Sequence, residues 1–206
     1  MKNKILSIAI ILVLSASFAF AQEKGNMSFG ILGGVNFQNL NGKLSSGDKL
    51  ENDMLLGFHG GVNVQIPIAP EFYFQPGLMF ATKGAKSTST ILGAEFTDET
   101  KINYIEMPLN LVYKAALGSG FFMLGFGPYV AYGISGKQVF KGNDLTFERG
   151  VEYDAFDAGG NIFAGFETAG GLFLQLDTQF GMLDIDPDEK TTAKNTGFGL
   201  SLGYRF

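Results

Sequence analysis

Apolar and polar residues alternate with a period of two along most of this chain. The clearest case is the last segment, residues 196–206. One face of it carries Phe198, Leu200, Leu202, Tyr204 and Phe206, and the other carries glycines, a serine and Arg205. Successive side chains of a strand point to opposite faces, so this pattern predicts a β-strand with one apolar side.

Eight segments share this alternation: residues 27–37, 55–66, 72–83, 101–114, 121–135, 154–167, 171–183 and 196–206. Each is close to, or somewhat longer than, the roughly 9–11 residues that a tilted strand needs to cross a bilayer. The connections alternate in length. Those after the second, fourth and sixth segments are short (67–71, 115–120 and 168–170), whereas the others are long and polar (38–54, 84–100, 136–153 and 184–195).

Outer-membrane barrels combine short periplasmic turns with long external loops. The sequence therefore predicts an all-β fold: an eight-stranded antiparallel up-and-down transmembrane β-barrel with short periplasmic turns and long extracellular loops. An even number of strands places both termini in the periplasm. The rival fold is a soluble secreted barrel that holds a ligand in its lumen.

Charged and polar residues fall on the predicted inner face among many glycines. An eight-stranded barrel is just wide enough for side chains to fill it, so we expect a filled lumen and not an open pore. The candidate lumen residues are Glu106, Glu167, Asp177, Arg205 and His59. We place Arg205 and Glu167 near the periplasmic rim and Asp177 and Glu106 deeper. An ion-pair network that satisfies buried charges is favoured over a gate or proton path.

Two sets of residues add expectations about the strands. Pro76, Pro108 and Pro128 lie inside predicted strands, where they remove ladder hydrogen bonds, so we predict β-bulges at these sites.

Aromatic residues near strand ends are predicted to form girdles at the membrane interfaces. They are Phe37, Phe72, Tyr104, Tyr113, Phe122, Tyr132, Phe166 and Phe198.

The N-terminal residues have the pattern of a secretory signal peptide. Lys2 and Lys4 precede an apolar stretch at 5–14, and Ala19 and Ala21 form a small-x-small cleavage site. We predict a cleaved signal peptide at 1–21 and a barrel domain at 22–206. The alternative, an uncleaved anchor, is disfavoured because the apolar stretch is shorter than the ~20 residues of a spanning helix.

Composition narrows the classes of partner and chemistry. The net charge is −5 and becomes more negative without the signal peptide, which disfavours nucleic acid as a partner. The chain has no cysteine, so disulfides and a lipid-modified cysteine are excluded. We expect no cofactor, and we expect a monomer that contacts outer-membrane lipids and lipopolysaccharide.

Two motifs that suggest chemistry are incomplete. A lipid hydrolase could use His59 with a serine and a carboxylate, but the sequence does not identify a serine paired with it. Asp184, Asp186 and Asp188 have the spacing of a calcium loop, yet Glu189 stands where that loop needs glycine and Asn195 where it needs glutamate. We therefore expect neither an enzyme nor a metal site, and a solvated external loop at 184–195.

Residues 104–109, Tyr-Ile-Glu-Met-Pro-Leu, resemble the Tyr-x-Glu-x-Pro-Leu stretch of the PorT-like outer-membrane β-barrel family of Bacteroidetes-type bacteria. The stretches 74–78, 125–130 and 202–206 are similar to that family too, and the final Phe206 resembles a barrel-insertion signal. The resemblance implies an eight-stranded barrel in the outer membrane of a Gram-negative cell envelope. It implies no single activity and no catalytic residues, although some members serve secretion or gliding machinery.

Together these observations predict an integral outer-membrane protein with a structural or interaction role. The alternatives are a PorT-like component of a secretion or gliding machinery, which would bind envelope or secretion proteins, and a lipid-modifying enzyme.

Overall fold

The computed structural model describes residues 27–91, 94–142, 145–188 and 190–206. The predicted signal peptide at 1–21 and Glu189 lie outside these residues. The described residues form nine strands: β1 (Ser28–Lys43), β2 (Leu55–Ala69), β3 (Phe72–Ile91), β4 (Ala94–Leu117), β5 (Gly120–Gly142), β6 (Leu145–Gly150), β7 (Phe156–Thr168), β8 (Leu172–Gly181) and β9 (Thr192–Arg205).

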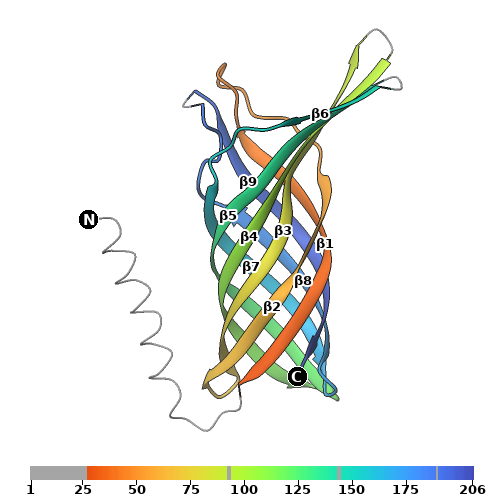
Figure 1. The fold of residues 1–206 in the computed structure, drawn as a ribbon. Helices are drawn as coiled ribbons and strands as arrows, with labels where there is room; N and C mark the ends of the chain where they lie inside the picture. Colours follow the sequence, from red (N-terminus) through yellow and green to blue (C-terminus); the bar gives the residue numbers. More distant parts are fainter. Residues whose placement is uncertain (1–26, 92–93, 143–144, 189) are drawn as a thin grey trace, which may run out of the picture.

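Eight of these strands close into a barrel (Figure 1). Each is antiparallel to its neighbours in the order β1, β2, β3, β4, β5, β7, β8 and β9, and β9 returns to β1. That seam runs from the Gly30–Arg205 pair to the Lys43–Thr192 pair. The predicted eight-stranded antiparallel barrel is therefore confirmed. The remaining strand, β6, pairs with the far end of β5 and lies outside the ring.

The barrel is apolar outside and largely polar inside. Phe58 and Leu202 are 58% and 57% exposed, whereas Gln65 and Ser201, on the opposite faces of the same strands, are each 1% exposed. This follows from the alternation, because every second side chain points into the lumen. Among the described residues, two clusters of buried apolar side chains stand out, one around Tyr104 and Tyr129 and one around Phe163 and Phe173.

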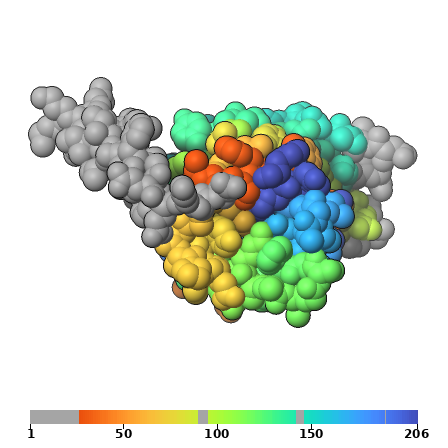
Figure 2. Space-filling model, turned by 90° about the horizontal axis from the view of Figure 1, so that it is seen from below, coloured from red at the N-terminus to blue at the C-terminus, as the bar shows by residue number. Residues whose placement is uncertain are grey.

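The three connections β2–β3, β4–β5 and β7–β8 are tight turns at one end, here called the short-turn end. The chain reverses there with left-handed residues, among them Gly118 (φ 60°) and Gly171 (φ 88°). A Cβ on Gly171 would lie 2.2 Å from the carbonyl oxygen of Arg205, so glycine is required at that position. Figure 2 looks onto this end and shows the atoms of the three turns and of the C-terminal strand packed together.

At the other end, three strands continue beyond the barrel. Residues 86–91, 94–99 and 137–142 of β3, β4 and β5 join β6 in a four-stranded extension, here called the projecting sheet (Figure 1). The predicted loops 84–100 and 136–153 therefore contain strands. Sequence alternation missed them because polar residues occupy both faces of this sheet, and the strand signal relied on one apolar face.

The prediction of bulges at the three prolines is wrong. The register of β3 with β4 is the same before Pro76 and after it, and the registers around Pro108 and Pro128 are likewise unchanged. The register shifts lie between Pro67 and Ala69 and between Asn103 and Tyr104 instead. Opposite Pro108 stands Gly77, whose missing side chain leaves room for the proline ring, 3.2 Å from an ideal Cβ.

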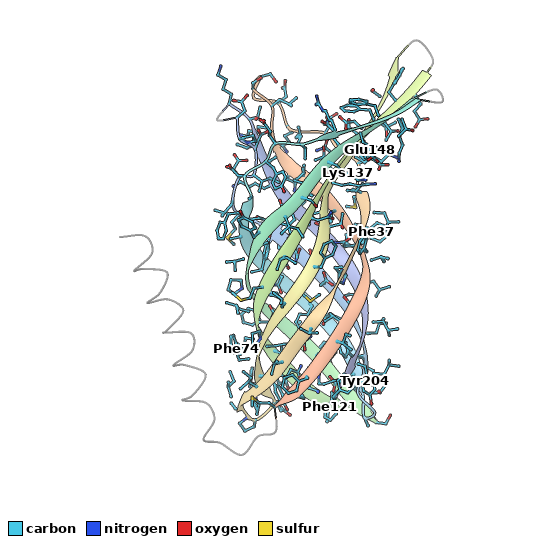
Figure 3. All side chains as sticks on the ribbon, in the orientation of Figure 1. Phe37, Phe74, Phe121, Lys137, Glu148 and Tyr204 are labelled. Carbon is cyan, nitrogen blue, oxygen red and sulfur yellow. The ribbon has the colours of Figure 1, made fainter. Side chains whose placement is uncertain are left out.

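Seven of the eight predicted girdle aromatics lie on the barrel exterior or are partly exposed. The eighth, Tyr104, is neither. Phe37 stacks on Phe198 with ring centroids 5.1 Å apart, and Phe72 packs on Tyr113 at 5.3 Å. Figure 3 shows Phe37 toward the long-loop end and Tyr204 toward the short-turn end. Tyr104 is fully buried in the lumen, because it has the same parity as Glu106 on β4. Its assignment to a girdle is wrong.

Candidate functional site

The lumen at the short-turn end is crossed by a charged cluster centred on Glu167 of β7. Arg205 of β9 places its Nε 2.9 Å from Glu167 Oε2, and Lys114 of β4 places its Nζ 2.6 Å from Glu167 Oε1. Arg205 also donates from Nη1 to Asn63 Oδ1 of β2 at 3.0 Å. The cluster therefore links four strands through groups that are almost fully buried.

A second charged cluster lies deeper and is centred on Lys83 of β3. Its Nζ is 2.7 Å from Glu106 Oε2 of β4 and 3.7 Å from Asp157 Oδ2 of β7, and all three side chains are at most 3% exposed. Gln179 of β8 donates to the other oxygen of Glu106 at 2.5 Å. Four strands are again joined across the lumen.

Two tyrosines cover the Lys83 ammonium. Lys83 Nζ lies 4.2 Å from the centroid of the Tyr129 ring and 5.4 Å from that of Tyr104. The Tyr129 hydroxyl also donates to Asp157 Oδ2 at 3.2 Å. The cation is thus held by carboxylates on one side and by aromatic faces on the other, an arrangement that is strengthened by exclusion of water.

His59 of β2 has a serine partner that the sequence analysis did not identify. Its Nε2 lies 2.6 Å from Ser201 Oγ of β9, and Ser201 Oγ donates to Asp177 Oδ1 of β8 at 3.5 Å. Gly34 of β1 pairs with both His59 and Ser201, so His59 reaches its partner across a residue that has no side chain.

This order of groups differs from that of a hydrolytic triad. In a triad the carboxylate orients the imidazole, which in turn activates the hydroxyl. Here Asp177 contacts the hydroxyl of Ser201, and the serine stands between the acid and His59. The geometry provides a hydrogen-bonded chain across three strands, without the carboxylate–imidazole contact that the triad mechanism uses.

The structure places Arg205 and Glu167 together at the short-turn end, and Glu106, Asp177 and His59 farther inside. Sequence analysis did not name Lys83 and Lys114 as lumen residues. The signal was present, because both have the inward parity of their predicted strands. A lysine at the end of a strand is assigned to the surface unless the alternation of inward and outward positions is extended to it.

Between the charged clusters lies a small cavity of about 70 Å³. Its walls include His59, Glu106, Asp177, Gln179 and Ser201. That volume holds only a few water molecules. The lumen between the two clusters therefore has room for a few water molecules among polar and apolar side chains.

The acidic loop after β8 binds its own backbone. Asp184 Oδ1 accepts hydrogen bonds from the amides of Asp186 and Ala193 at 3.1 and 2.8 Å, and Asp186 Oδ1 accepts from the Asp188 amide at 3.0 Å. The spacing that resembles a calcium loop thus serves turn formation. In the residues that the structure describes, no group of three or more His, Cys, Asp or Glu side chains is arranged to hold a metal ion.

Comparisons with known proteins bear on identity. No curated protein matches the chain. A crystal structure of Ail, the attachment invasion locus protein of Yersinia pestis, in complex with the heparin analogue sucrose octasulfate, is similar at 14% identity and a TM-score of 0.43, over 88% of this chain and 100% of that chain. Neisserial surface protein A (NspA) is similar at 13% identity and a TM-score of 0.45, over 88% of this chain and 98% of that chain.

The described residues contain no helix that is long and apolar enough to cross a membrane. The family model for the outer membrane protein beta-barrel domain matches residues 20–186, most of the chain and most of its barrel strands. Together with the closed ring of strands and its apolar exterior, this match identifies an integral outer-membrane β-barrel protein, and the chain belongs to the outer membrane protein beta-barrel domain family.

Proposed function

We propose that this protein has a structural or interaction role in the outer membrane, with a lumen closed by side chains and not an open pore. The observation that carries the proposal is the pair of charged clusters, in which Lys83 joins two carboxylates and Glu167 joins two cations, each from different strands. These contacts stabilise the ring and occupy its cross-section. The projecting sheet then supplies the contact surface.

Ion conductance tests whether the lumen is closed. The purified full chain, folded into planar bilayers, is expected to give no stepwise conductance at either polarity. A porin reconstituted in parallel serves as the positive control. Regular conductance steps from the wild-type protein would contradict the proposal, because they would require a continuous water path past the two clusters.

The proposed orientation places both termini and the short-turn end in the periplasm and the projecting sheet outside the cell. The alternation of loop length supports it. Because the chain has no cysteine, single-cysteine variants report on it cleanly. Ser46→Cys, in the connection after β1, should react with a membrane-impermeant maleimide on intact cells. Ser119→Cys, in the β4–β5 turn, should react only after the outer membrane is permeabilised, and the reverse pattern would overturn the orientation.

A role as a PorT-like component of a secretion or gliding machinery is the alternative. Its support is the Tyr-x-Glu-x-Pro-Leu resemblance at 104–109. Cross-linking in cells followed by co-purification separates the two roles. Stoichiometric capture of envelope or secretion proteins would favour the machinery, whereas a monomer recovered with outer-membrane lipids and lipopolysaccharide would favour a stand-alone surface protein.

We also propose that the protein is not an enzyme, and the His59–Ser201–Asp177 order supports this. If the barrel hydrolysed phospholipid or lipopolysaccharide, purified protein would release fatty acid from vesicles and His59→Ala would abolish the release. We expect no release from either protein. Release by the wild type that the substitution removes would establish the enzymatic alternative.

A further inference from the structure

The outer wall of β3, β4 and β5 changes character abruptly toward the long-loop end. Below the change stand Phe80 and Ile105, which are cross-strand partners on the apolar exterior. The next outward row is polar: Thr82 Oγ1 donates to Asn103 Oδ1 at 2.8 Å, and Asn103 Nδ2 donates to Ser135 Oγ at 3.0 Å. This row of polar side chains, bonded to one another, is the limit of the apolar exterior on this wall.

The row beyond this limit holds two lysines directly opposite each other. Lys101 of β4 pairs with Lys137 of β5, and their side chains are 30% and 51% exposed. Like charges at facing positions of an antiparallel pair destabilise it. A bound anion between the two ammonium groups would remove that repulsion.

Neighbouring residues on the same face leave an excess of positive charge. Lys101 and Lys141 share Glu99, at 2.6 and 2.9 Å, and Lys137 lies 3.3 Å from Glu148. Three lysines therefore share two carboxylates. The set Lys101, Lys137 and Lys141 is called here the lysine patch. Figure 3 shows Lys137 and Glu148 where the projecting sheet leaves the barrel, nearer the long-loop end than Phe37.

We propose that the lysine patch binds the phosphate groups of a phosphorylated lipid in the outer leaflet. The inference rests on the proposed orientation, which puts this wall outside the cell. Lys101 lies two residues beyond Asn103, about 7 Å along the strand, which is the level of lipid headgroups just above the hydrocarbon. Lysine stems lie along apolar surface while their ammonium groups reach a polar layer. A basic cluster at that height attracts anionic headgroups.

Binding of lipid A tests the proposal directly. The full-length barrel in nanodiscs is mixed with diphosphorylated lipid A, and native mass spectrometry measures the fraction of barrels that retain it. The double variant Lys101→Gln/Lys137→Gln should bind at least about tenfold more weakly, since each basic residue near a charged surface contributes about a factor of five. The matched control Lys49→Gln/Lys190→Gln removes equal charge from the loops after β1 and β8 and should retain wild-type binding.

A second variant separates a binding site from a structural ion-pair network. Glu148→Gln removes the carboxylate that competes for Lys137, so it should increase lipid A retention, whereas the network alone predicts no gain. Heat-dependent gel mobility confirms that each variant is folded.

Three results would overturn the proposal: equal retention of dephosphorylated lipid A, unchanged binding by Lys101→Gln/Lys137→Gln, or inorganic phosphate that binds as tightly as lipid A and so identifies a site for free anions. Each would leave the conductance and maleimide results of the proposed function intact, so the two failures are distinguishable.

Discussion

Gly34 shows at the scale of one residue how the lumen is built. It pairs with His59 on one side and with Ser201 on the other, and a Cβ there would lie 2.0 Å from the carbonyl oxygen of Leu200. The glycine leaves space that longer polar side chains from neighbouring strands occupy. Small residues and long polar residues on the inner face are therefore complementary parts of one packing scheme.

A single substitution tests the deeper charged cluster, which is centred on Lys83. Replacing Lys83 with Met keeps side-chain volume but leaves Glu106 and Asp157 without their shared cation. We expect the free energy of unfolding in urea to fall by about 3–5 kcal/mol, the cost of an uncompensated buried charge. The matched control is Lys86→Met, three residues along β3 on the outer face, which should change stability by less than about 1 kcal/mol. Equal effects of the two substitutions would refute the assignment of Lys83 to the lumen network.

Arg205→Leu tests the cluster at the short-turn end. The substitution removes one of the two cations on Glu167, and Lys114 keeps its contact with the other oxygen. We therefore expect a smaller loss than for Lys83, about 2–3 kcal/mol in urea unfolding. Adding both Glu167→Gln and Lys114→Met to Arg205→Leu should recover part of that loss, because the buried carboxylate and its remaining ammonium partner are then removed together. No recovery would show that the lost packing of Arg205 against Phe173, and not the charge, dominates.

At the scale of elements, the projecting sheet differs from the strands of the barrel. Its strands lie beyond the lumen, and they are held by cross-strand pairs such as Phe140 with Phe147 and by the Asp98–Gln138–Arg149 hydrogen bonds. Polar contacts of this kind depend on the charge state of their members. The stability of this element should therefore depend on pH.

The pKa of Glu99 determines in which direction the stability of the projecting sheet changes with pH. Partial burial raises its pKa, but hydrogen bonds from Lys101 and Lys141 outweigh burial and hold the pKa below the ordinary value of 4.5. A carboxylate with a lowered pKa in the folded state stabilises above its unfolded pKa, and this contribution is lost as pH falls through the folded value. We expect amide hydrogen exchange at 97–101 and 139–141, corrected for intrinsic rates, to become faster below about pH 4.5.

The variant Glu99→Gln isolates this effect. Its exchange in the projecting sheet should be fast at neutral pH and should change little on acidification. Protection in the wild type that stays constant from neutral pH to pH 3 would contradict a role for Glu99 in holding the sheet. The barrel strands serve as an internal reference, since their exchange should not follow Glu99.

For the whole molecule, alternation was sufficient to predict the ring of eight strands, the short turns and the inner and outer faces. A one-residue shift would reverse every side chain, so the apolar face fixes the register. The projecting sheet was missed because each of its faces includes polar residues, and Phe96, Phe140 and Phe147 share theirs with Asp98, Gln138 and Arg149. Lys83 and Lys114 were missed because the inward parity of these strand-end residues was not followed. The His59–Ser201 contact was missed because it depends on which strands lie close together in the ring, and sequence spacing along one strand does not contain that information.

The claim on which the rest depends is that β1 and β9 close the ring in the stated register. Val35 and Leu200 face each other across this seam, and the cysteine-free chain allows both to be replaced by cysteine. We predict that a short thiol-specific cross-linker joins Val35→Cys to Leu200→Cys within one folded chain, and that the pair Val35→Cys and Leu176→Cys, one strand farther on, stays unlinked. Cross-linking of the second pair but not the first, or linkage only between different molecules, would contradict a barrel closed by its first and last strands.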